Sequence, residues 1–144
     1  MLQKIKNNRY LRILLAAVLA LILAAAALIL LSRAARQRQD ALLAKVEAVW
    51  TRAVEGETDC YLKLTLQDGE MEYRFVSIAY PSLSETFFTY GYTAMDEDTL
   101  RVTFPDGAKL DVDVTLNEDG SEMTFSPAVT VAEESETWTR GSEK

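Results

Sequence analysis

The chain has 144 residues, of which 49% are hydrophobic and 26% are charged, and it contains no histidine and one cysteine. Without histidine it lacks the commonest general base and the commonest metal ligand, which excludes histidine zinc sites and Ser–His nucleophile pairs. The lone Cys60 excludes an internal disulfide.

The net charge of −7 is divided unevenly along the chain. Residues 1–45 carry eight Lys and Arg against the single acidic Asp40, whereas residues 46–144 carry seven Lys and Arg against 21 Asp and Glu. The basic part suits anionic lipid headgroups. The acidic part repels a phosphate backbone, so we expect no nucleic-acid partner.

Residues 1–12 form a basic tail, and the next nineteen, residues 13–31, lack any charged or hydrogen-bonding side chain (ILLAAVLALILAAAALILL). As a helix this run spans about 28 Å, close to the roughly 30 Å apolar core of a bilayer. We therefore predict a transmembrane helix that contacts the lipid bilayer through residues 13–31. A cleaved secretory signal is the alternative, although its apolar region usually runs for only about 7–15 residues.

The charges on the two sides of this helix do not decide its orientation. Four basic residues precede the apolar run and four follow it closely, so the positive-inside rule hardly discriminates. A short amino end followed by one span most simply acts as a signal anchor. We predict a single-pass protein of the cell membrane with a cytoplasmic N-terminus and an extracytoplasmic C-terminal domain.

Residues 32–48 are rich in Ala, Arg, Gln and Leu, which predicts a juxtamembrane helix or linker. Leu42, Val46 and Val49 form a weak apolar stripe at helical spacing. Such a stripe either docks on the neighbouring domain, which we favour, or serves self-association.

Residues 49–140 alternate apolar and polar side chains, with turn residues every 8–12 positions. This pattern predicts a mainly β domain of seven to nine short antiparallel strands, followed by a disordered tail at residues 141–144. We favour a small up-and-down β-barrel over a β-sandwich, because closure removes exposed strand edges. Cys60 falls at the start of one strand, where a buried apolar role is favoured over a reactive thiol or an intermolecular bridge.

The sequence Trp-Thr-Arg stands at both ends of this domain, as residues 50–52 and 138–140. A tryptophan on the first strand and an arginine on the last resemble the lipocalin-like (calycin) barrels, including small ones in bacterial envelope proteins. The resemblance implies that Arg140 lies across Trp50 where the barrel closes, a contact with cation–π character. In the alternative, Trp50 belongs to the apolar stripe of the preceding helix.

Five aromatic residues occupy alternating positions of the predicted strands. In a small barrel they either fill the interior, which we favour, or line a cavity for a small apolar ligand. The five are Tyr73, Phe75, Phe88, Tyr90 and Tyr92.

Carboxylates are plentiful, but their spacing favours solvated strand faces and turns. Asp111 and Asp113 alternate on one face, as do Glu70 and Glu72. The acidic run at residues 96–98 and the run at 117–120 lack the spacing of a calcium loop. We expect no metal, no cofactor and no catalytic residue.

We therefore expect a non-enzymatic binding or interaction module held at the cell envelope. Its partner is either a small apolar ligand or another envelope protein. One alternative is an accessory structural subunit of a membrane complex, since alanines recur along the predicted span. A carboxylate-based hydrolase is the third hypothesis.

Overall fold

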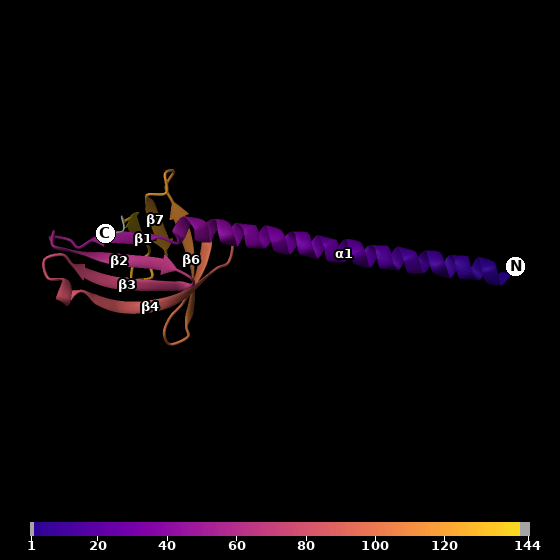
Figure 1. The fold of residues 1–144 in the computed structure, drawn as a ribbon, viewed down its shortest axis with the longest axis horizontal. Helices are drawn as coiled ribbons and strands as arrows, with labels where there is room; N and C mark the ends of the chain where they lie inside the picture. Colours follow the sequence, from indigo (N-terminus) through magenta and orange to yellow (C-terminus); the bar gives the residue numbers. More distant parts are fainter. Residues whose placement is uncertain (1, 142–144) are drawn as a thin grey trace. The chain divides into compact units, whose positions relative to one another are not determined.

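A computed structural model describes residues 2–141 of the chain, with side chains described from residue 8. A long helix, α1 (Leu2–Val46), precedes a closed antiparallel barrel (Figure 1). The predicted mainly β, up-and-down barrel is confirmed, and the sandwich alternative is wrong. The eight strands are β1 (Val49–Ala53), β2 (Cys60–Gln67), β3 (Glu70–Ser77), β4 (Glu85–Ala94), β5 (Thr99–Thr103), β6 (Lys109–Leu116), β7 (Glu122–Ser126) and β8 (Glu136–Arg140), and a 3-10 helix, η1 (Pro81–Leu83), joins β3 to β4.

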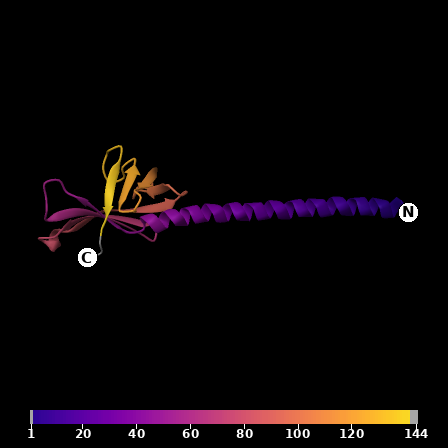
Figure 2. The same ribbon diagram turned by 90° about the horizontal axis from the view of Figure 1, so that it is seen from above.

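Each strand pairs with the next one along the chain, and β8 pairs with β1 to close the barrel (Figure 2). Tight turns between consecutive strands allow each strand to pair with the next one. Between β2 and β3, Asp68 and Gly69 have φ angles of 52° and 81°. A two-residue type I′ turn needs two such positive values, and its twist matches that of the flanking strands.

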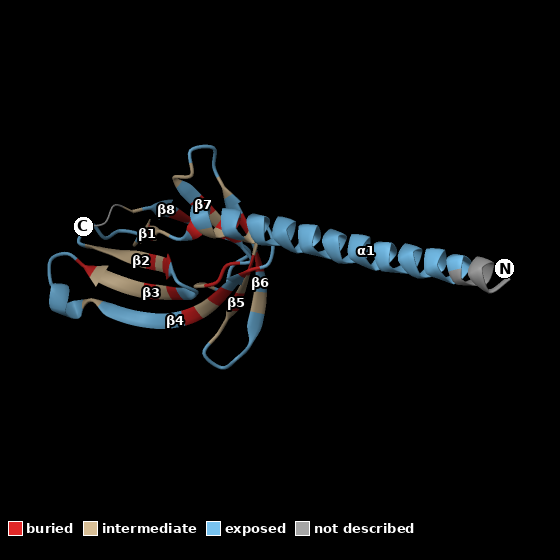
Figure 3. Ribbon diagram, turned by 45° about the vertical axis from the view of Figure 1, so that its right-hand side comes forward, coloured by how far each residue is buried: buried red, intermediate tan, exposed pale blue. Residues whose placement is uncertain are grey.

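The chain forms two compact units, Met1–Gln37 and Arg38–Lys144. In the first unit, α1 is long and apolar enough to cross a membrane, a property that a membrane anchor and a secretory signal share. Its described side chains are exposed, as the pale blue helix in Figure 3 shows. The helix continues through most of residues 32–48 and ends at Val46.

In the second unit, the last turns of α1 pack on the barrel. Leu42 and Val46 are 1% and 0% exposed and belong to the barrel core. The indole Nε1 of Trp50 donates a 2.9 Å hydrogen bond to the carbonyl of Val46. The apolar stripe of Leu42 and Val46 therefore docks on the barrel, which is the interpretation that the sequence favoured. Val49, the third residue of the predicted stripe, lies in β1 instead.

The barrel interior beside α1 is filled with side chains. Alternate positions on the strands point inward, and those near α1 are buried (red in Figure 3). Fully buried members include Trp50, Leu64, Leu66, Met71, Leu100, Val102, Val112 and Met123.

The structure also shows the surroundings of Cys60 and of the carboxyl end of the barrel domain. The free Cys60 begins β2 and is partly buried. At the carboxyl end, Gly141 donates its N–H to the carbonyl of Val49 at 2.8 Å. The rest of the predicted tail, residues 142–144, lies outside the described residues.

Candidate functional site: the open end of the barrel

The end of the barrel away from residues 38–46 is formed where odd-numbered strands finish and even-numbered strands begin. Because neighbouring strands are antiparallel, the last residues of β1 and β3 meet the first residues of β4 and β8 there. We call this end the mouth and define it by Arg52, Phe75, Phe87, Phe88 and Glu136.

The mouth is less tightly closed than the end beside α1. Several inward positions near it are only partly buried, and Phe88 is 52% exposed, whereas Phe125 and Glu136 are buried. The partly buried ones are Arg52, Leu62, Phe75, Phe104 and Leu110. Part of the aromatic surface at this end is therefore accessible to solvent.

Two charged residues face each other inside the mouth. Arg52 stands two residues after the buried Trp50, and Glu136 stands two residues before the buried Trp138, so alternation turns both inward. Nη1 of Arg52 lies 3.8 Å from Oε2 of Glu136, and their side chains are 31% and 0% exposed. The pair joins the first and last strands across the barrel closure.

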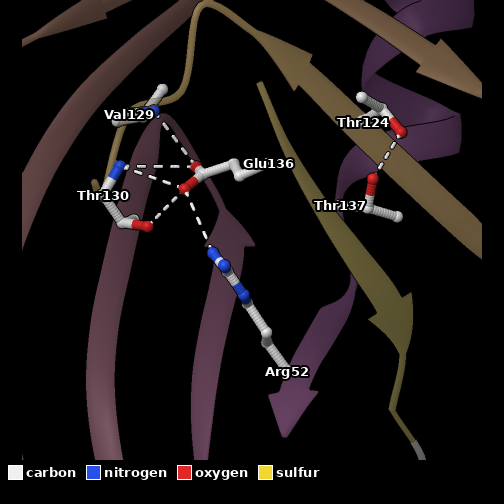
Figure 4. A network of polar contacts seen from close by, with 6 residues as sticks. All are labelled: Arg52, Thr124, Val129, Thr130, Glu136 and Thr137. Atoms are coloured by element: carbon white, nitrogen blue, oxygen red, sulfur yellow. Dashed lines mark hydrogen bonds and ion pairs between the residues drawn. The ribbon is translucent and has the colours of Figure 1, made fainter. Parts of the chain in front are cut away.

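Glu136 also holds the connection between β7 and β8 (Figure 4). Its carboxylate accepts hydrogen bonds from the N–H groups of Val129, at 3.1 Å, and Thr130, at 3.3 Å. The Thr130 hydroxyl donates to the same carboxylate. These donors satisfy the carboxylate oxygens of Glu136 without a direct hydrogen bond from Arg52.

Arg52 therefore keeps hydrogen-bonding capacity inside the mouth. Its Nη1 is buried, yet it has no hydrogen-bond acceptor among residues 2–141. The same holds, within that part of the chain, for Nε1 of the fully buried Trp138. Because leaving a buried donor unpaired is costly, these atoms favour a ligand that brings an acceptor.

Aromatic rings surround this polar pair. The register of β3 and β4 shifts after Tyr73, which leaves Phe87 as the extra residue of a bulge. The Phe87 ring centroid is 5.3 Å from that of Tyr73 and 6.3 Å from that of Phe75. Tyr73 in turn contacts Trp138 edge to face, with centroids 6.1 Å apart. The apolar wall thus runs continuously from the mouth to the buried Trp138.

The environment of the mouth also affects its tyrosines. Burial, followed by the nearby charge of Glu136, raises the pKa of Tyr73. Burial, followed by Tyr73, raises the pKa of Tyr90. Both phenols therefore stay neutral at physiological pH and can donate a hydrogen bond.

The structure divides the five predicted aromatic residues between the two ends of the barrel. Tyr73, Phe75, Phe88 and Tyr90 lie toward the mouth, where the Phe88 and Tyr90 rings stack with centroids 5.8 Å apart. Tyr92 lies beside α1, and its hydroxyl donates to Oε2 of Glu47 at 2.7 Å. Tyr73, Tyr90 and Tyr92 belong to the buried core, whereas Phe88 is exposed at the mouth.

The resemblance placed Arg140 across Trp50, and the two residues are direct partners in the β1–β8 pairing. Cζ of Arg140 lies 5.3 Å from the Trp50 ring centroid. Nη2 of Arg140 also donates to the carbonyl of Lys45 at 3.0 Å. Trp50 belongs to β1, so the alternative that placed it on the preceding helix is wrong.

Sequence reasoning did not single out Arg52, Phe87 or Glu136 as site residues. Period-two spacing from the two tryptophans is the signal that finds Arg52 and Glu136. Phe87 is different, because a bulge breaks the alternation and nothing in the sequence marks its position.

Among residues 8–141, no three Cys, Asp or Glu side chains gather as a metal site would require. No protein-family model, curated protein or solved structure matches this chain.

Proposed function

We propose that this chain is a membrane-anchored, non-enzymatic binding module of the bacterial cell envelope, built on a lipocalin-like barrel. Its ligand is a small amphiphile that enters the mouth. The single observation that supports this most strongly is the buried Nη1 of Arg52, which has no hydrogen-bond acceptor among the described residues, at a barrel end that also exposes the rings of Phe87 and Phe88.

The mouth offers two kinds of contact to such a ligand. An apolar chain would cover Phe75, Phe87 and Phe88, and about 25 cal/mol is gained for each Å² of apolar surface removed from water. An acceptor on the ligand would reach Arg52, whose guanidinium favours carboxylate geometry. Ligand pockets commonly combine an apolar lining with a few such polar groups.

The anchor determines where this binding takes place. Residues 13–31 would cross the bilayer, and the basic residues on either side would lie among anionic headgroups. We place the N-terminus in the cytoplasm and the barrel outside it. The acidic barrel would then be repelled from the anionic membrane surface and remain accessible to diffusing amphiphiles.

Tryptophan quenching tests the proposal directly. The full chain, in phosphatidylcholine nanodiscs, is titrated with an undecanoate that carries bromine at the end of its chain. Trp50 and Trp138 are the two tryptophans of the chain, and both are buried in the barrel. Saturable quenching is expected from a ligand in the mouth, because Trp138 is part of the continuous aromatic wall.

The Arg52→Gln variant should weaken binding of this carboxylate about tenfold or more, because it removes a charge-assisted hydrogen bond. A matching bromoalcohol should be affected less. Arg101→Gln is the control, since Arg101 pairs with Asp111 on the exposed face of β5 and β6. Linear, unsaturable quenching that is equal in all three proteins would refute the proposal.

A further inference from the structure

Three large apolar side chains project into solvent beside the mouth. Ile78, Tyr80 and Leu83 are 61%, 67% and 63% exposed. They belong to residues 78–84 (IAYPSLS), the connection through η1 that carries no charge. We call these three residues the apolar rim. Exposed apolar residues gathered in one segment commonly mark an interaction surface.

Hydrogen bonds fix the backbone of the apolar rim in this conformation. Ile78 donates its N–H to the carbonyl of Asp59 at 2.7 Å, and Leu83 donates to the carbonyl of Tyr80 at 2.9 Å. The side-chain oxygens of Ser77 and Ser84 accept two further backbone N–H groups. The fold therefore presents the apolar side chains on an ordered segment.

Acidic residues lie next to the apolar rim in the chain and in the connection that is hydrogen-bonded to it. The connection between β1 and β2, which the Asp59–Ile78 hydrogen bond joins to the rim, holds Glu55, Glu57 and Asp59. Glu85 begins β4 directly after the rim. All four side chains are exposed, and residues 54–59 and 78–88 contain no Lys or Arg. A complementary partner would thus combine an apolar stripe with flanking cations.

We propose that the apolar rim docks a basic amphipathic helix of a partner protein. The apolar face of the helix would cover Ile78, Tyr80 and Leu83, and its Lys and Arg side chains would face the surrounding carboxylates. Helices bind in this way through apolar residues at i, i+3, i+4 and i+7. The inference goes beyond amphiphile binding and uses none of the mouth residues.

Charge argues against the other occupants of this surface. Residues 38–144 contain nine Lys and Arg against 22 Asp and Glu, so a second copy of the barrel would meet like charge. An anionic lipid surface would be repelled in the same way. A cationic partner is attracted instead.

The test uses the full chain in phosphatidylcholine nanodiscs and a dye-labelled, 18-residue peptide of leucine and lysine with its leucines on one helical face. Fluorescence anisotropy measures binding, and signal from empty nanodiscs is subtracted. We expect saturable binding that weakens severalfold when salt rises, because exposed charges are screened. A scrambled peptide of the same composition should bind about tenfold or more weakly, since it lacks a continuous apolar face.

Paired variants locate the binding site. Ile78→Ser combined with Leu83→Ser should weaken peptide binding about tenfold or more, because two apolar contacts are lost. Met95→Ser is the matched control, since Met95 is an exposed apolar residue that follows β4 at the other end of the barrel. Glu55→Gln with Glu57→Gln should reduce the salt dependence, whereas Asp106→Asn with Glu118→Gln should not.

Equal binding of the scrambled peptide, or unchanged binding by the Ile78/Leu83 variant with its thermal unfolding intact, would overturn the inference. Self-association in sedimentation that the same variant abolishes would assign the apolar rim to a second copy. Rim-dependent flotation of the barrel with added lipid vesicles would assign it to a membrane. Both results would also overturn the inference. The Arg52→Gln variant should bind the peptide normally, so failure here is separate from failure of amphiphile binding.

Discussion

Nη1 of Arg52, on the first strand, lies 3.8 Å from Oε2 of Glu136, on the last strand, inside the barrel. The carboxylate is fully buried and already receives hydrogen bonds from Val129 and Thr130. The guanidinium is partly exposed and has a buried N–H without an acceptor among the described residues. Glu136 thus ties the β7–β8 connection to the barrel, whereas Arg52 keeps a donor that the described residues leave without an acceptor.

The hydrogen bonds that Glu136 accepts from Val129 and Thr130 predict that Glu136→Gln lowers the stability of the barrel. The neutral amide keeps the shape but loses the charge, and we expect a cost of about 1.5–3 kcal/mol, since hydrogen bonds to charged groups contribute that much. Urea unfolding in mild detergent, followed by tryptophan fluorescence, measures the change. Glu133→Gln, on an exposed residue of the same connection, is the control and should cost little.

The contact between Trp50 and Arg140 predicts a measurable coupling across the barrel closure. A double-mutant cycle of Trp50→Leu and Arg140→Met should give a coupling energy of about 0.5–1 kcal/mol, the range for an exposed cation–π contact. The same cycle with Arg101→Met should give a value near zero. A coupling no larger for Arg140 than for Arg101 would show that the stacked geometry contributes nothing to stability.

The docked end of α1 predicts that Leu42 supports the barrel. Leu42→Ala removes a side chain that is 1% exposed and should cost about 2–5 kcal/mol of barrel stability. Leu28→Ala is the control, because Leu28 is 66% exposed in the first unit. Equal urea midpoints for the two variants would contradict the assignment of residues 38–46 to the barrel.

The hydrogen bond from Tyr92 to Glu47 predicts a pH effect above about pH 10, where an unfolded tyrosine ionises. Burial, followed by this bond, raises the pKa of Tyr92, so the folded chain keeps a proton that the unfolded chain releases. Wild-type stability should therefore fall relative to Tyr92→Phe by up to about 1.4 kcal/mol for each pH unit above that value. Between pH 7 and 9 the difference between the two proteins should stay constant. A constant difference up to pH 11 would contradict the raised pKa.

Alternation along the strands predicted a sided antiparallel β domain, and the removal of exposed edges by closure favoured the barrel over the sandwich. The spacing of Leu62, Leu64 and Leu66 puts these three side chains on one face, and the structure turns that face inward. The helical stripe of Leu42 and Val46 likewise predicted which part of α1 docks. These features follow from local periodicity, which a single sequence carries.

The mouth depends on features that periodicity does not carry. The bulge that places Phe87 beside Tyr73 comes from the pairing of β3 with β4. The polar network depends on the connection 127–135 folding back so that Val129 and Thr130 reach Glu136. Such a contact between a loop and a strand is set by tertiary packing, so the sequence did not indicate Glu136 as a site residue.

Photolabelling tests the central claim, ligand binding at the mouth, most directly. An alkyl carboxylate with a diazirine near the end of its chain is bound to the full chain in nanodiscs, irradiated, and mapped by peptide mass spectrometry. We predict labels within residues 73–90 and 136–138 that excess decanoate removes and that Arg52→Gln reduces. Labels confined to residues 8–31, unaffected by decanoate and by the variant, would show that the carboxylate only dissolves in the bilayer and would contradict the claim.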